Sequence, residues 1–108
     1  MEKPFIGVVH FNNKTFQENE IWRKDRSYEG CVYGLDKRIE NIPYEERIFI
    51  IEMNNDTDEI TGIGQIYNIF REDNRSRIYS NQNYNRIVYK GKKRIIRKEL
   101  LIRNKDII

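Results

Sequence analysis

Apolar and polar residues alternate along most of this 108-residue chain, in short segments that turn-forming residues separate. Such alternation predicts strands, because successive side chains of a strand point to opposite faces of a sheet. The densest segment is residues 47–68, RIFIIEMNNDTDEITGIGQIYN, in which a polar turn divides two apolar series. We expect a β-hairpin here, and the four consecutive apolar residues of its first strand place it at the centre of the sheet.

Two glycines interrupt the second strand of this hairpin, where Gly62 and Gly64 flank Ile63. Glycine destabilises a strand unless a bend, a bulge or a closely approaching group requires it. We expect a bend or a barrel corner at these two positions.

The rest of the chain predicts further short strands and little helix. Four more segments have the composition of strands: residues 4–11, 30–34, 84–89 and 93–97. The capping-box spacing of Thr15 and Glu18 predicts a short helix, and another begins at residue 98. A strand-rich chain of this size avoids bare sheet edges most simply by closing its sheet into a small barrel. The sequence therefore predicts a mainly β (α+β) single domain over residues 1–108, a small pseudo-barrel of five to six strands with one or two short helices.

Composition indicates the cellular setting. Isoleucine occurs 18 times and asparagine 12 times, and alanine is absent, a bias that an AT-rich genome imposes through its codons and that points to a large DNA virus or an AT-rich microbe. Cys31 is the only cysteine, so no internal disulfide forms, and a reducing compartment is expected. No segment approaches the roughly 20 apolar residues that span a membrane, and no secretory pattern begins the chain. We expect no membrane partner and a cytoplasmic or nuclear protein, in the host cell if it is viral.

Charge is distributed unevenly. Residues 1–70 carry 8 basic and 13 acidic side chains, whereas residues 71–108 carry 12 basic and 4 acidic. A basic segment of this kind favours a polyanionic partner. The alternative is that these side chains form the solvated outer faces of a strand and a helix.

Aromatic residues interleave with the basic ones, which favours nucleic acid as that partner. Because residues two apart share a face of a strand, Tyr84 and Tyr89 point in opposite directions, and one of them belongs to the core. Lysine and arginine neutralise phosphates, and exposed rings stack on unpaired bases. The predicted phosphate contacts are Lys90, Lys92, Lys93, Arg94 and Arg97. The predicted base-sized pocket consists of Trp22, Tyr33, Asn54 and Asn55, with Trp22 in a loop as either a lid or a pocket wall.

Catalytic and metal-binding patterns are weak. A nucleophilic pair would have to combine Cys31 with His10, the only histidine, and no motif supports that pairing. One cysteine and one histidine do not supply a zinc site. Asn54, Asp56 and Asp58 alternate as calcium ligands do, but the loop lacks the glycine and glutamate that a calcium site needs, so a turn is favoured. We predict no catalytic residue, no metal and no cofactor.

The order of these segments resembles the PUA-like superfamily, which includes the PUA, ASCH, EVE and YTH domains. The resemblance lies in Trp22 ahead of GCVYG, then IFIIEMNN, ITGIGQIYN and the closing YNRIVYKGKKRIIR, over roughly residues 5–100. It implies a small pseudo-barrel whose cleft binds RNA or a modified base. YTH domains use a cage of several aromatic residues, mostly tryptophan, and this chain has one tryptophan. Some ASCH proteins are enzymes, but no catalytic set of theirs is matched here.

Three functions follow as hypotheses. The leading one is a nucleic-acid-binding module without enzymatic activity, for RNA or single-stranded substrates, because no long helix suits the major groove of a duplex. The second is a nuclease or hydrolase of the ASCH type that uses Glu52 with lysine or tyrosine partners. The third is a viral protein-interaction module whose acidic half docks a host protein. The sequence does not specify the oligomeric state.

Overall fold

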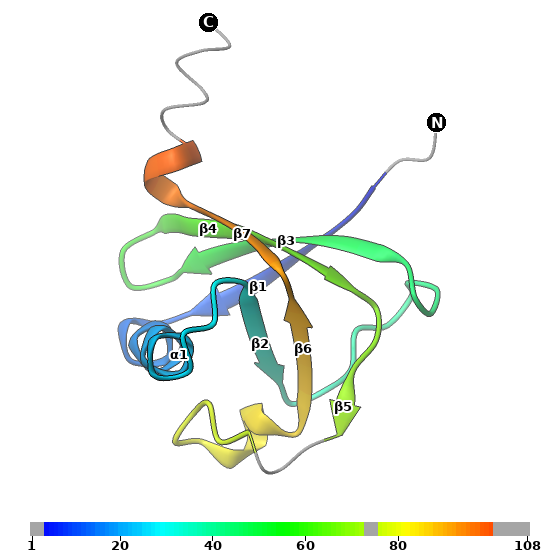
Figure 1. Cartoon of the computed structure of the whole chain (residues 1–108), viewed down its shortest axis with the longest axis horizontal. Coiled ribbons are helices and arrows are strands. Elements are labelled where there is room, and N and C mark those ends of the chain that lie inside the picture. Colours follow the sequence, from blue (N-terminus) through cyan, green and yellow to red (C-terminus); the bar gives the residue numbers. More distant parts are fainter. Residues whose placement is uncertain (1–3, 73–75, 101–108) are drawn as a thin grey trace, which may run out of the picture.

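This computed structural model describes residues 4–72 and 76–100 of the chain. These residues contain seven strands and two helices, joined by loops (Figure 1). In chain order the elements are β1 (Phe5–Phe11), α1 (Asn13–Asp25), β2 (Cys31–Leu35), β3 (Arg47–Asn54), β4 (Glu59–Tyr67), β5 (Arg71–Glu72), the 3-10 helix η1 (Gln82–Asn85), β6 (Ile87–Gly91) and β7 (Lys93–Ile96). Residues 97–100 add one helical turn after β7, and the predicted terminal helix beyond residue 100 lies outside the described residues.

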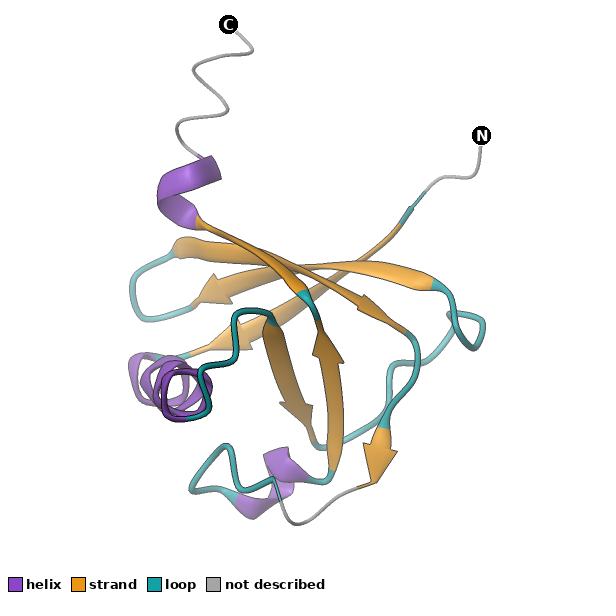
Figure 2. Ribbon diagram, in the orientation of Figure 1, coloured by secondary structure: helices purple, strands orange, loops and turns teal. Residues whose placement is uncertain are grey.

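The strands form two sheets (Figure 2). A four-stranded sheet has the order β1-β3-β4-β7, and a three-stranded sheet has the order β2-β6-β5. β1 runs parallel to β3, and the other pairs are antiparallel. The predictions of a mainly β fold and of a central hairpin are confirmed, since β3 and β4 are the two inner strands of the larger sheet. Strand pairing among the described residues forms two sheets and no closed barrel, and it comprises seven strands rather than five to six.

The two faces of the four-stranded sheet differ in burial. Along β3 the side chains alternate between a buried set that begins with Ile48 and Ile50 and a half-buried set that begins with Phe49 and Ile51. The buried set faces the three-stranded sheet, and the other set lies on the outer face. On that outer face Ile6 and Val8 of β1 are 62% and 51% exposed. The larger sheet therefore has an apolar outer face that water reaches.

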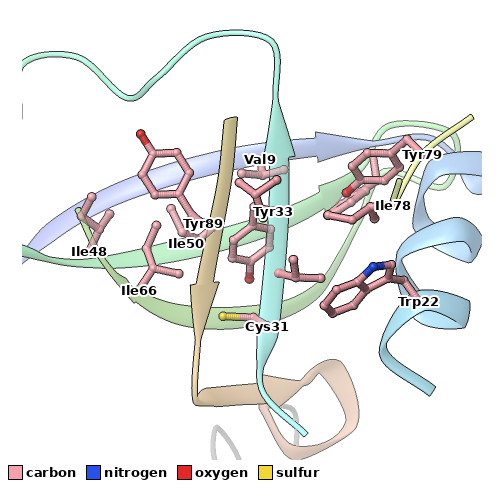
Figure 3. Packing of buried hydrophobic residues seen from close by; sticks show 13 residues of the cluster. Val9, Trp22, Cys31, Tyr33, Ile48, Ile50, Ile66, Ile78, Tyr79 and Tyr89 are labelled. Atoms are coloured by element: carbon pink, nitrogen blue, oxygen red, sulfur yellow. The ribbon is translucent and has the colours of Figure 1, made fainter. Parts of the chain in front are cut away.

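Tyrosines and aliphatic side chains fill the space between the sheets (Figure 3). Tyr89 is completely buried, its ring lies 5.9 Å from that of Phe70, and its hydroxyl accepts a hydrogen bond from the Ile39 amide. Tyr84 is 43% exposed. The prediction that only one of these two tyrosines is in the core is confirmed, although Tyr84 lies in η1 and not in a strand.

Helix α1 is longer than its sequence indicated. Asn12 caps it: the Asn12 side chain accepts from the Thr15 amide, and the Thr15 hydroxyl accepts from the Asn12 amide. The capping box therefore begins at Asn12 and not at Thr15, as asparagine is among the preferred N-cap residues. The helix runs for 13 residues, so Trp22 belongs to a helix and not to a loop. No helix within residues 4–72 and 76–100 has the length and apolar character that crossing a bilayer requires.

Candidate nucleic-acid interface and the polar network beneath it

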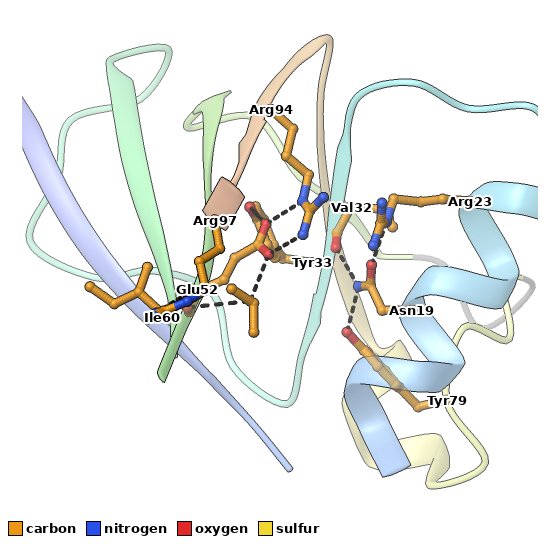
Figure 4. Close-up of polar contacts among 10 residues, drawn as sticks. Asn19, Arg23, Val32, Tyr33, Glu52, Ile60, Tyr79, Arg94 and Arg97 are labelled. Atoms are coloured by element: carbon orange, nitrogen blue, oxygen red, sulfur yellow. Dashed lines mark hydrogen bonds and ion pairs between the residues drawn. The ribbon is translucent and has the colours of Figure 1, made fainter. Parts of the chain in front are cut away.

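A buried ion pair joins two strands of the larger sheet. Glu52 on β3 accepts two hydrogen bonds from the Arg94 guanidinium on β7, at 2.7 Å (Nη2 to Oε1) and 2.8 Å (Nε to Oε2) (Figure 4). The two side chains are only 7% and 3% exposed, for Arg94 and Glu52 respectively. Two parallel hydrogen bonds from one guanidinium give a strong and geometrically specific pair.

Two hydroxyl groups complete the surroundings of the Glu52 carboxylate. Tyr33 donates to Oε2 at 2.6 Å, and Thr61 donates to Oε1 at 3.1 Å. Burial alone would raise the pKa of Glu52, but the hydrogen bonds and charge of Arg94, with the two hydroxyl donors, lower it below its usual value. Burial and the adjacent carboxylate raise the pKa of the Tyr33 phenol. Glu52 is therefore a carboxylate in which each oxygen already accepts two hydrogen bonds.

The glycines of β4 make room for this network. A Cβ at Gly64 would collide with the Tyr33 hydroxyl and would lie 2.7 Å from the Cys31 sulfur. A Cβ at Gly62 would lie 2.7 Å from the Ile95 carbonyl oxygen. The pairing with β3 skips Thr61, so β4 has an irregularity directly before Gly62. Close approach of neighbouring atoms leaves no room for a side chain at either glycine.

The residues considered for catalysis occupy separate environments. Cys31 is fully buried, its thiol lies 3.7 Å from the Gln65 carbonyl, and burial raises its pKa. His10 is exposed on β1 and its Nδ1 lies 3.1 Å from the Asn55 amide oxygen. Across residues 4–72 and 76–100, no group of three or more histidine, cysteine or acidic residues is arranged to hold a metal ion.

Three of the predicted phosphate ligands are exposed within one short segment of the chain. Lys90 is the exposed residue of β6, Lys92 lies between β6 and β7, and Lys93 begins β7. All three lysines are exposed. We call these three residues the lysine ridge. Arg97, partly exposed, donates to the Ile60 carbonyl and lies 3.6 Å from Glu59. Arg94, by contrast, points inward to Glu52, so we assign it to the polar network and not to the ridge.

Two hollows border the lysine ridge. The larger one, the sheet groove, has a volume of about 780 Å³ and an apolar floor that includes Phe49, Ile51 and Ile63, with Lys92 and Lys93 at its side. The smaller one, the β6 hollow, has a volume of about 310 Å³. Its lining consists of Tyr67, Ile69, Arg71, Ser76, Val88 and Lys90. Lysines from one short segment therefore border both hollows.

The four residues predicted to form a base-sized pocket line neither hollow. Tyr33 is buried with its hydroxyl on Glu52. Trp22 is 7% exposed, and its indole N–H donates to the Ser76 carbonyl, while Arg26 lies 4.4 Å and Lys90 5.2 Å from its ring. Trp22 is therefore a core residue whose ring lies close to two cationic side chains.

The two asparagines order the turn between β3 and β4. Asn54 is 4% exposed, donates to the Asn13 side chain and accepts from the Asp56 amide. Asn55 is exposed beside His10, and its backbone N–H donates to the Phe11 carbonyl. The Asn54 side chain thus serves the backbone of the turn, whereas the Asn55 side chain contacts His10.

Sequence reasoning missed the aromatic and basic residues of the β6 hollow. Tyr67, Ile69 and Arg71 occur at alternate positions, and all three are exposed. A strand-like spacing of two carried the signal that they share a face. It escaped notice because β4 ends at Tyr67 and β5 has only two residues, so no long strand pattern marked the segment.

The chain was compared with known proteins, and no family model, no curated protein and no solved structure matches it.

Proposed function

We propose that this protein binds single-stranded nucleic acid, RNA in particular, along the lysine ridge. The observation that carries the proposal is that Lys90, Lys92 and Lys93 are exposed within four consecutive positions and border two hollows that contain aromatic side chains. A fully extended chain spans at most about 3.3–3.6 Å per residue, so Lys90 and Lys93 are at most about 10 Å apart along the backbone, with Lys92 in the bend between β6 and β7.

The β6 hollow supplies a place for a base. Tyr67 is 51% exposed, and Arg71 and Lys90 line the same hollow. An exposed tyrosine ring beside two cations suits a nucleotide, since the ring stacks on the base while the cations neutralise the phosphate. Phe49 offers a second, partly exposed ring in the sheet groove. Stacking tolerates any base, so we expect little sequence preference.

The resemblance to the PUA-like superfamily is part of this proposal. We propose that the two sheets are the two sides of a PUA-like pseudo-barrel. In support, the chain passes directly between the sheets at two places, from β4 to β5 and from β6 to β7. At the second crossing the backbone of Gly91 packs against the Gln65 carbonyl so closely that no Cβ fits.

The hydrolase hypothesis has less support. A general base needs a lone pair that can reach a substrate proton. Glu52 is 2% exposed and both of its carboxylate oxygens are engaged by Arg94 and by hydroxyl donors. These contacts favour a structural role for Glu52.

The test is the salt dependence of binding to a labelled single-stranded RNA, measured by fluorescence anisotropy. For single strands the log-log slope changes by roughly 0.7 per neutralised phosphate, so a triple alanine variant of Lys90, Lys92 and Lys93 should lose about 2 units of slope. The matched control replaces the exposed Lys14, Lys24 and Lys37, which removes the same charge from the acidic part of the chain. Equal weakening by both triple variants, or no binding at low salt, would refute the proposal.

A second arm tests the base site. Tyr67→Ala should weaken binding about 5- to 150-fold, because stacking of a base on an aromatic ring contributes about 1–3 kcal/mol. Tyr44→Ala is the control, since Tyr44 is 69% exposed and lies in the connection before β3. Duplex RNA and single-stranded DNA of the same length complete the comparison, and stronger binding of the duplex would contradict recognition of unpaired bases.

A further inference from the structure

Strand β1 forms one edge of the four-stranded sheet. It pairs with β3 through all seven residues, Phe5 to Phe11, and no other strand of the described residues pairs with it. In a parallel pair, alternate residues direct their N–H and C=O groups to the neighbouring strand, and the residues between them direct these groups away. About half of the backbone groups of β1 therefore point to its outer side. Apart from the Phe11 carbonyl, which accepts from Asn55, no backbone hydrogen bond of the described residues beyond those to β3 involves this strand.

The two edges of this sheet differ in how they are protected. Proteins usually guard an edge strand with charged residues, proline or a bulge, because an unguarded edge pairs readily with another strand. The opposite edge, β7, has an exposed lysine at its start, and Arg97 and Lys98 follow it directly. Strand β1 has the sequence FIGVVHF, with no acidic residue, lysine or arginine, and Pro4 stands immediately before it. Of the two edges of this sheet in the described residues, β1 is the one without lysine, arginine or an acidic residue, and Pro4 guards only its start.

Two apolar side chains of β1 are also exposed to solvent. Ile6 and Val8 share the outer face of the strand and are 62% and 51% exposed. β-branched residues on neighbouring antiparallel strands stabilise each other when they lie opposite. The strand thus offers both backbone groups and apolar side chains to a further strand.

We propose that β1 pairs antiparallel with β1 of a second copy of this chain, so that two four-stranded sheets join into one of eight strands. A two-fold axis perpendicular to the sheet makes the paired strands antiparallel, uses the free edge of both copies and closes the assembly at a dimer. A second copy fits this edge because the strand carries no formal charge other than that available to His10, so no like charges of lysine, arginine or acidic residues face each other. Pairing centred on Gly7 places Ile6 of each copy opposite Val8 of the other.

This dimer is separable from the proposed nucleic-acid site. β1 and β7 are the two opposite edges of the sheet, and Val8 lines neither hollow, although Ile6 of β1 lines the sheet groove. Val8→Lys is therefore the variant that separates the two proposals. Loss of dimerisation should leave the RNA affinity of a single site in place, and loss of RNA binding should leave the dimer in place. The failure of one proposal is therefore distinguishable from the failure of the other.

The experiment measures the mass in solution by light scattering and sedimentation over a series of protein concentrations. The wild-type chain should reach twice its 13.2 kDa mass as concentration rises, and Val8→Lys should reduce the mass to that of one chain. Ile21→Lys is the matched control, because Ile21 is 50% exposed on α1, and it should remain dimeric. Circular dichroism verifies folding, and Ile6→Lys serves as the second edge variant if Val8→Lys does not fold.

Amide hydrogen exchange locates the interface. The β1 amides that point away from β3 should exchange more slowly as the wild-type concentration rises, and this concentration dependence should vanish in the edge variant. A wild-type chain that stays monomeric at every concentration overturns the proposal, and so does an open series of oligomers. Dissociation by Ile63→Lys on the outer face, with Val8→Lys remaining dimeric, would also overturn it by placing the contact on the face of the sheet.

Discussion

Replacing Arg94 by methionine tests whether the buried ion pair stabilises the fold by joining β3 and β7, the two strands that flank β4. Methionine keeps the apolar part of the side chain and removes the guanidinium, so Glu52 loses two hydrogen bonds of 2.7 and 2.8 Å. Glu52, which is 2% exposed in the wild-type structure, then keeps only its two hydroxyl donors. An unpaired buried charge is the most costly polar defect in a protein interior.

The magnitude can be worked from this geometry. Two unit charges about 4 Å apart attract by about 4 kcal/mol at an effective dielectric constant near 20. Removing one partner of a buried pair costs about 3–5 kcal/mol. Small domains have a total free energy of unfolding of roughly 5–15 kcal/mol, so Arg94→Met should remove a large part of it. The melting temperature should fall by more than about 10 °C.

The assay is urea unfolding followed by the fluorescence of Trp22, which is buried on α1 and is the only tryptophan. Glu52→Gln in the Arg94→Met background removes the unpaired charge, so the double variant should be more stable than Arg94→Met alone. Arg86→Met is the control at an exposed arginine and should change the free energy of unfolding by less than about 0.5 kcal/mol. The reasoning is refuted if Arg94→Met costs less than about 1 kcal/mol, or if Glu52→Gln adds to the loss.

Two further predictions concern the same network. Because the pKa of Glu52 is lower in the folded chain than in the unfolded chain, its contribution is present above the unfolded value of about 4.3 and disappears as the pH falls through the folded value. Urea midpoints over a pH series should therefore fall in acid for the wild type and fall less for Glu52→Gln; identical pH profiles would contradict this. Gly64→Ala should cost about 1–3 kcal/mol, because the new methyl group displaces the Tyr33 hydroxyl. Gly7→Ala should cost less in the same unfolding assay, because a Cβ there meets the flexible end of Ile50 at 3.1 Å and Ile48 at an ordinary contact distance of 3.8 Å.

The strands were largely predictable because their signal is local. Alternation along residues 47–68 indicated the central hairpin. The same rule assigned only one of Tyr84 and Tyr89 to the core, although Tyr84 lies in η1, outside the strand that the rule assumed. A short helix near Thr15 was predicted, but the full length of α1 was not, because its apolar residues fit helical spacing poorly. Contacts with distant segments hold it instead: Asn19 donates to the Val32 carbonyl and the Tyr79 hydroxyl, and Trp22 donates to the Ser76 carbonyl.

The basic segment shows where local reasoning stops. Lys93 and Arg94 are neighbours with similar charge, and alternation places them on opposite faces of the predicted strand without indicating which face is buried. The pairing of β7 with β4 places Arg94 opposite Gly64 and turns its side chain toward Glu52, whereas Lys93 remains exposed at the sheet groove.

By itself, then, the sequence determined the mainly β character, the hairpin and the excess of positive charge after residue 70, because composition and a period of two are properties of neighbouring residues. The tertiary structure alone decided which cation is buried, which tyrosine meets Glu52 and which strand lies at an open edge. Each of these depends on pairing between segments far apart in the chain, such as the parallel contact of β1 with β3, and a local pattern does not encode such pairing.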